Sequence, residues 1–284
     1  MDIFNSWQSN LFLYYIFVVI FYQTYKLAVQ HAIKDGAATI FLQLIAGLSC
    51  LFLIPFFPLK FSSGTAIWLL LVGACLFYAL NDRLQTTVRK NLPVSTFSII
   101  GQSTTIFLLI ISVLFFNGSL GINKIVGAIL IIVANIILFY KRDGIVLNKY
   151  FWLTLLASLS FAIAISIDVG ISQNFNLPLY VALTLFIPAL MIALADKLHI
   201  KEIVAESKSL NLKYYVITGI SWALTIVFSL RTYQLGEVSI MVSLQAVSVL
   251  LNVIVASIIL KERADIYKKI IAATLVIIGV YLTV

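Results

Sequence analysis

Ten apolar stretches of about 20 residues, separated by short polar breaks, run along the chain. A bilayer core about 30 Å thick needs about 20 apolar residues to be crossed by a helix. Uninterrupted runs such as VGAILIIVANIILFY (126–140) favour helices over the alternating strands of a membrane barrel. We therefore expect an all-α integral membrane protein with ten transmembrane helices, near 11–29, 37–58, 65–86, 94–116, 122–140, 150–172, 178–196, 214–233, 238–260 and 266–284.

Composition excludes a soluble protein with a membrane tail. Hydrophobic residues make up 62% of the chain and charged residues 11%, against about 25% charged residues in soluble domains. The longest break, 196–213, is predicted to be at most an interfacial helix or a flexible loop. Cys50 and Cys75 fall inside predicted spans, where we expect small buried apolar side chains without a redox or metal role.

The net charge of +8 is distributed unevenly between the breaks. Fourteen Lys and Arg residues, including Arg89 and Lys90, are assigned to the breaks after the odd-numbered stretches, and three to the opposite side. By the positive-inside rule the odd-numbered breaks are cytoplasmic and both termini are outside. The charge thus indicates membrane topology, and nucleic acid is not an expected partner.

The second half of the chain repeats the layout of the first. At an offset of 144 residues, Val94-Ser95 aligns with Val238-Ser239, and the polar break NGSLGINK aligns with KERADIYK between two apolar stretches. We predict two five-helix repeats, 1–145 and 146–284. Because five is odd, the second repeat must enter the membrane from the opposite side. Such inverted repeats are typical of secondary transporters that work by alternating access.

The stretches LGEVS and LQAVSVLLNVIVASIILKE, together with the closing IIAATLVIIGVYL, resemble the drug/metabolite transporter superfamily in its ten-helix EamA type. The resemblance implies metabolite transport, with cavity walls from the first, third, fourth, sixth, eighth and ninth helices. Glu262 stands at the family's Glu position, whereas the first half has Gly118 there. The resemblance also implies cytoplasmic termini, opposite to the loop charge.

Ionisable residues within the spans are functional candidates, because a charge at the bilayer centre costs about 2.5–3.5 kcal/mol even on insertion scales. Lys26 and Asp168 occupy equivalent positions in the two repeats. We predict the ion pairs Lys26–Asp82 and Asp168–Arg231, each closing a gate or meeting a polar substrate. Alternatively, Lys26 and Arg231 reach towards the interface and Asp168 caps a helix end.

Uncharged polar and aromatic residues complete the predicted cavity. The resemblance favours the helices that carry Gln23, Gln102, Trp222, Gln245 and Asn252 over those that carry Gln43 and Asn135. Tyr22 neighbours Lys26. The predicted substrate-binding residues are therefore Tyr22, Gln23, Lys26, Asp82, Gln102, Asp168, Trp222, Arg231, Gln245 and Asn252. In the alternative interpretation the amides only hydrogen-bond neighbouring helices.

The sequence contains no phosphate-binding loop, nucleophile elbow or metal-ligand cluster. We expect no catalysis, cofactor or metal. The leading interpretation is a secondary transporter or exporter of small organic solutes, with a coupling proton or counter-substrate possible, acting in the plasma membrane as a monomer or homodimer. The alternatives are a flippase for lipids or lipid-linked sugars, and a receptor or assembly subunit that does not transport.

Overall fold

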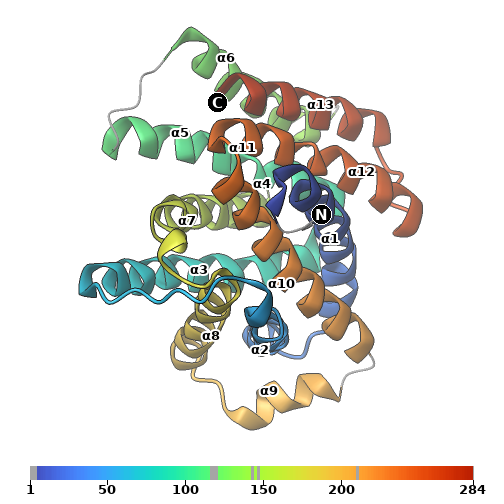
Figure 1. Cartoon of the computed structure of the whole chain (residues 1–284). Helices are drawn as coiled ribbons and strands as arrows, with labels where there is room; N and C mark the ends of the chain where they lie inside the picture. Colours follow the sequence, from blue (N-terminus) through green and yellow to red (C-terminus); the bar gives the residue numbers. More distant parts are fainter. Residues whose placement is uncertain (1–4, 116–120, 142–143, 146–147, 209–210, 284) are drawn as a thin grey trace.

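The computed structural model describes residues 5–115, 121–141, 144–145, 148–208 and 211–283. Within them the chain is a bundle of α-helices with two helical turns and one two-residue strand pair (Figure 1). The elements are α1 (Trp7–Val29), α2 (Asp35–Leu51), η2 (Ile54–Phe56), α3 (Thr65–Asn91), α4 (Val94–Gly101), α5 (Ser103–Phe115), α6 (Ile122–Phe139), β1 (Tyr140–Lys141), β2 (Gly144–Ile145), α7 (Lys149–Ile171), η3 (Ser172–Asn174), α8 (Leu177–Ala195), α9 (Ile200–Ser207), α10 (Leu212–Leu235), α11 (Val238–Ala246), α12 (Ser248–Ile259) and α13 (Ile266–Thr283).

Eight helical segments among the described residues are long and apolar enough to cross a membrane. Many large apolar side chains on their outer faces are exposed, such as Leu69 at 69% and Tyr281 at 72%. An apolar surface of this extent is stable only against lipid. The chain is therefore an all-helical, multi-pass membrane protein. The other two predicted spans correspond to the shorter apolar helices α2 and α6.

Several predicted boundaries differ from the observed ones. Helix α2 ends at Leu51 rather than 58, and the 3-10 turn η2, which contains Pro55, follows it. Helix α3 continues to Asn91, five residues beyond its predicted end. The predicted fourth and ninth spans are each broken into two helices, at Gln102 and at Val247.

Local side-chain chemistry explains where several helices begin. The Asn148 side chain accepts a hydrogen bond from the Phe151 N–H at the start of α7, and Asn176 does the same for Leu179 at the start of α8. Such caps satisfy backbone donors that have no partner inside the helix. Glu262, from the connection after α12, accepts hydrogen bonds from the first N–H groups of α4, so its role here is structural.

The helices pack in pairs that join distant parts of the chain. The most extensive contacts are α1 with α10, α6 with α13, α3 with α7, and α2 with α8. In Figure 1 α6 and α13 lie side by side at one edge of the bundle. A Cβ added to Gly127 would lie 2.4 Å from the Gly279 carbonyl oxygen. Small residues allow this close approach of two backbones, as is common between membrane helices.

Four connections meet at one end of the bundle: those after α1, α3, α8 and α12. We call it the basic end, because Lys34, Lys90, Lys197 and Lys261 lie in or beside these connections. Lys90 at the end of α3 donates to the Ala32 carbonyl and to the Asp35 carboxylate. The short helix α9, which follows α8, contacts α2. The 196–213 break was predicted to hold an interfacial helix or a flexible loop, and α9 is a helix within it.

Candidate functional site

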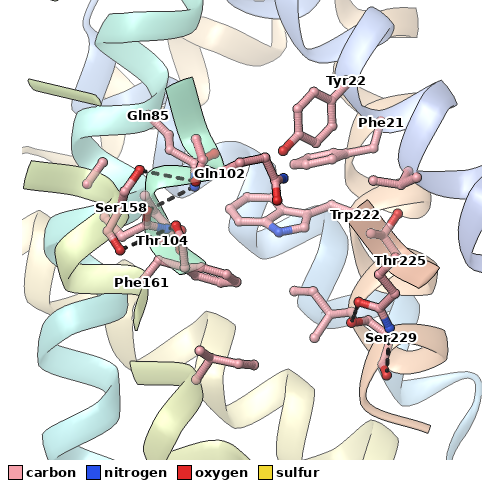
Figure 2. A pocket seen from close by; sticks show the side chains of 18 of the residues that line it. Phe21, Tyr22, Gln85, Gln102, Thr104, Ser158, Phe161, Trp222, Thr225 and Ser229 are labelled. Carbon is pink, nitrogen blue, oxygen red and sulfur yellow. Dashed lines mark hydrogen bonds between the residues drawn. The ribbon is translucent and has the colours of Figure 1, made fainter. Parts of the chain in front are cut away.

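A cavity of about 240 Å³ lies between the helices, somewhat below the usual range for ligand pockets of about 300–1,000 Å³. Its walls come from α1, α3, α4, α5, α7, α8, α10 and α11. Figure 2 shows the Trp222 ring in the same space as the polar side chains of Gln102 and Ser158. Five of the ten predicted site residues line the cavity: Tyr22, Asp82, Gln102, Trp222 and Gln245.

Gln245 is held in a set of polar contacts between α10 and α11. Its side-chain oxygen accepts hydrogen bonds from the Ser229 hydroxyl at 3.0 Å and the Tyr233 hydroxyl at 2.8 Å. Its amide nitrogen donates to Thr232 Oγ1 at 2.7 Å. Ser229, Tyr233 and Gln245 all line the cavity, so this wall offers a fixed arrangement of polar groups to a solute.

The opposite wall is built where α4 and α5 meet α7. Gln102 lies at the break between α4 and α5. Beside it, the Thr104 hydroxyl donates to the Ser158 carbonyl, and the Ser158 hydroxyl donates to the Gly101 carbonyl, each at 3.4 Å. A broken helix exposes backbone groups that an intact helix would use internally, and in transporters such breaks line substrate sites.

Asp82 brings a buried carboxylate to the cavity wall. Its two oxygens accept hydrogen bonds from the side-chain nitrogens of Gln43 and Asn81, each at 2.8 Å. The side chain is 4% exposed, and Asn81 also lines the cavity. Gln43, which was disfavoured as a cavity residue, does not line the cavity and instead positions Asp82.

Arg89 is a site residue that the sequence analysis missed, because it was counted among the loop residues. It lies in the last turns of α3, lines the cavity and is 3% exposed. Its guanidinium carbon lies 4.1 Å from the ring centre of Tyr22, 4.2 Å from that of Phe97, 4.7 Å from that of Tyr25 and 4.9 Å from that of Phe21. The residues Asn81, Gln85 and Arg89 follow one another at i, i+4 and i+8, a spacing that could have revealed this face.

The predicted ion pair between Lys26 and Asp82 is wrong. The Lys26 ammonium donates to the carbonyl oxygens of Lys90 at 2.8 Å and Leu92 at 3.0 Å, at the end of α3. The C-terminus of a helix attracts cations because its last carbonyls lack partners. Asp82 is eight residues earlier, about 12 Å along the axis at 1.5 Å per residue. Lys26 therefore joins α1 to α3 outside the cavity lining.

The predicted ion pair between Asp168 and Arg231 is also not formed. The Asp168 carboxylate accepts hydrogen bonds from the hydroxyls of Tyr78 and Tyr180. The Arg231 guanidinium donates to Gln234 Oε1 at 3.2 Å and Asn5 Oδ1 at 3.3 Å. Neither predicted partner lines the cavity, although Tyr78 does and so connects Asp168 to it.

Gln23 and Asn252 also lie outside the cavity lining. The Gln23 amide nitrogen donates to the Asn252 backbone oxygen at 3.3 Å, which joins α1 to α12. Asn135, which was disfavoured, donates to the Ser103 hydroxyl at 3.1 Å, between α6 and α5. These amides act as interhelical hydrogen-bond groups, the alternative interpretation given above.

Several contacts close the basic end of the bundle. Glu206 of α9 is fully buried and accepts hydrogen bonds from the N–H groups of Ile33 and Lys34, at 2.9 and 3.1 Å, and from the Tyr215 hydroxyl at 2.9 Å. Lys34 also pairs with Glu202, which lowers the Glu202 pKa chiefly through their hydrogen bond. An ion pair between Arg83 and Asp196 adds a link between α3 and the end of α8.

Metal ligands are not grouped in the part of the chain that the structure describes: no cluster of three or more His, Cys, Asp or Glu side chains is found there. Cys50 and Cys75 are buried and not joined to each other.

Comparison with known proteins gives a fold without a family. No protein-family model matches the chain, and no curated protein matches it. Several solved structures match, and one of them, described only as "Crystal structure of protein", has a TM-score of 0.65 and 13% sequence identity, covering 96% of each chain. At this identity the likeness shows a shared fold over nearly the full length. The resemblance to the drug/metabolite transporters therefore stays a proposal.

Proposed function

We propose that the chain is a secondary transporter of small organic solutes that works by alternating access, as the resemblance to the EamA-type drug/metabolite transporters implies. The observation that carries the proposal is the cavity of about 240 Å³, whose walls come from helices of both halves of the chain. A site between two packed halves is reached from one side or the other when the halves rock against each other.

The helix contacts support two inverted five-helix repeats. In such repeats each helix of the first half has an equivalent in the second half: α1 and α7, α2 and α8, α3 and α10, α4/α5 and α11/α12, and α6 and α13. If every helix is replaced by its equivalent, each contact should turn into another contact that is observed. The contact of α1 with α10 then becomes that of α7 with α3, and α2 with α10 becomes α8 with α3. The contact of α1 with α12 becomes α7 with α5, while the pairs α2–α8 and α6–α13 map onto themselves. Each repeat would also carry one broken helix, at Gln102 and Val247.

The basic end supports counting α2 as a membrane span. The hydrogen bond from Lys90 to the Ala32 carbonyl places the connections after α1 and after α3 at the same end of the bundle. Helix α3 ends at the basic end and crosses the bundle, so it begins at the opposite end. Since α1 also ends at the basic end, α2 has to carry the chain across the bundle to the start of α3. At 17 residues, α2 is about 25 Å long, close to the thickness of a thin bilayer. Ten crossings in the plasma membrane are the topology that we propose.

The contacts at the basic end indicate which state of the transport cycle the structure represents. The ring layer around Arg89, the Lys26 contacts to α3 and the Glu206 contacts to the α1–α2 connection all lie between the cavity and this end. Opening it requires these contacts to break together. We infer that the structure corresponds to the state closed at the basic end, which loop charge assigns to the cytoplasm.

The experiment is solute release from proteoliposomes. Vesicles are loaded with a defined mixture of amino acids, amines, carboxylates, nucleobases and sugar phosphates, and released solutes are measured by mass spectrometry against protein-free vesicles. Thr225→Trp fills the cavity, because Thr225 is 8% exposed and lines it. Leu69→Trp, on the lipid-facing surface at 69% exposure, is the matched control.

A transporter releases at least one solute class faster than protein-free vesicles do, and the release is lost in Thr225→Trp but kept in Leu69→Trp. No protein-dependent release of any solute would contradict the proposal. Fluorescent lipids in the same vesicles test the flippase alternative, which predicts lipid movement that the cavity-filling variant blocks. Absence of both activities favours the receptor or assembly subunit.

A further inference from the structure

The Arg89 guanidinium is a buried cation at the end of the cavity nearest the basic end. Four aromatic rings surround it at 4.1 to 4.9 Å, and the side chain is 3% exposed. Cation–π contacts attract a guanidinium to the faces of the rings, but the rings carry no net charge. The rings therefore position the group without neutralising it.

The hydrogen-bond partners of Arg89 leave part of the guanidinium unused. Its Nε donates to Gln85 Oε1 at 3.1 Å, and the Tyr22 side chain is a second hydrogen-bond partner of the guanidinium. Its Nη1 is buried and has no hydrogen-bond partner, and no acidic side chain among the described residues forms an ion pair with it. A guanidinium presents five N–H donors in a planar fork that matches a carboxylate. The unpaired donor lies on a side chain that lines the cavity.

Asp82 limits the kind of anion that fits. It lines the same cavity seven residues before Arg89, about 10.5 Å along the helix axis, and its carboxylate is already held by Gln43 and Asn81. A second negative charge on the ligand would be repelled by this carboxylate in a poorly solvated space. A monoanion is therefore favoured over a phosphate ester or a dicarboxylate.

The rest of the cavity suits an apolar or aromatic body. Trp222 stacks on Phe21 with ring centres 5.6 Å apart, and both rings line the cavity beside the guanidinium layer. Figure 2 places the ring of Phe161 in the same space. The volume of about 240 Å³ holds a small metabolite and excludes a large one.

We propose that Arg89 is the anion-binding group of the transport cavity and that the ligand is a small organic monocarboxylate with an apolar or aromatic body. This inference rests on the proposed function, because it names the substrate class of the same cavity.

The test uses three probes with one body and different head groups: 3-phenylpropionate, 3-phenylpropionamide and 3-phenylpropylamine. Acetate, hexanoate and indole-3-acetate extend the carboxylate series to smaller and larger bodies. Binding to the full chain in detergent is measured by the dose-dependent shift of the melting temperature. Variants are Arg89→Gln and Arg89→Lys, and the matched control is Arg263→Gln in the exposed connection after α12.

The expected result is that at least one carboxylate raises the melting temperature of the wild type and of Arg263→Gln, while the amide and the amine do not. The dissociation constant rises at least about 10-fold in Arg89→Gln, as expected when a charge-assisted bidentate pair is lost, and less in Arg89→Lys. If Arg89→Gln does not fold, Arg89→Lys decides, because it keeps the charge and loses only the fork.

Three results would overturn the inference: equal stabilisation by the amide or amine, unchanged carboxylate affinity in the Arg89 variants, or no shift with any carboxylate. Solute release from proteoliposomes separates this failure from failure of the proposed function. If Thr225→Trp blocks release but no carboxylate binds, the proposed transport function stands and the proposed anion site is wrong. If a carboxylate binds in an Arg89-dependent way but no solute is released, the proposed anion site stands and the proposed transport function is wrong.

Discussion

Replacing the buried Glu206 is expected to destabilise the protein far more than replacing its partly exposed neighbour one turn earlier, Glu202. Glu206→Ala leaves the N–H groups of Ile33 and Lys34 and the Tyr215 hydroxyl without their acceptor. Each unsatisfied buried donor costs about 1–3 kcal/mol, so we expect a loss of about 3–5 kcal/mol in unfolding free energy, since water replaces part of the acceptor near the surface.

That loss corresponds to a fall of roughly 6–10 °C in the melting temperature, at about 2 °C per kcal/mol for a chain of this size. Thermal unfolding of the purified protein in detergent, followed by intrinsic fluorescence, measures it. Glu206→Gln keeps one acceptor oxygen and should lose about half as much. Glu202→Ala is the matched control, because its ion pair with Lys34 is exposed to solvent. Equal shifts for the two alanine variants would refute the account of α9 as an anchor.

The remaining predictions concern the α6–α13 contact, the cavity and the basic end. Gly279→Ala places a Cβ 2.7 Å from the Gly127 carbonyl oxygen and should lower the unfolding free energy by about 1–3 kcal/mol or more. Gly170→Ala is the control, because open space surrounds Gly170 and the added Cβ should not destabilise the protein. Equal melting temperatures of the two variants would contradict the close α6–α13 contact. Trp222→Ala should lower the affinity for any solute with an aromatic ring by roughly 5-fold or more, as measured by the dose-dependent melting shift. Unchanged affinity would place the solute elsewhere. The lowered pKa of Glu202 gives stability that is present above the ordinary Glu pKa of about 4.3 and is lost as the pH falls through the lower folded-state value. Glu202→Gln should remove this part of the pH dependence of the melting temperature. Identical pH profiles of the wild type and the variant would count against the ion pair.

Hydropathy predicted the all-helical membrane class and the centres of the spans, because the bilayer sets the length of apolar helices. It failed at the end of α3. Residues 87–91 lie beyond the predicted span 65–86 and were assigned to water because most of them are polar, but here Arg89 faces the inside of the protein. Arg89 was therefore counted as loop charge, and the most unusual group of the cavity was missed.

The predicted ion pairs failed for a different reason. Sequence position limits which helix ends are neighbours but does not choose between a side chain and a backbone partner. Lys26 uses the last carbonyls of α3, and Asp168 uses two tyrosine hydroxyls, one of them 90 residues away in the chain. Cavity residues such as Gln102, Trp222 and Gln245 were predicted because the resemblance named the helices that form the walls.

The most direct test of alternating access is the accessibility of one cysteine in the cavity. Gln102→Cys is made in a background with Cys50→Ala and Cys75→Ala, both of which remove buried, unpaired thiols. A membrane-impermeant maleimide is applied to sealed proteoliposomes of known orientation, from outside or trapped inside. The account predicts labelling from either side, with a bound solute changing the two rates in opposite directions. Labelling from one side only, unchanged by any solute, would contradict it.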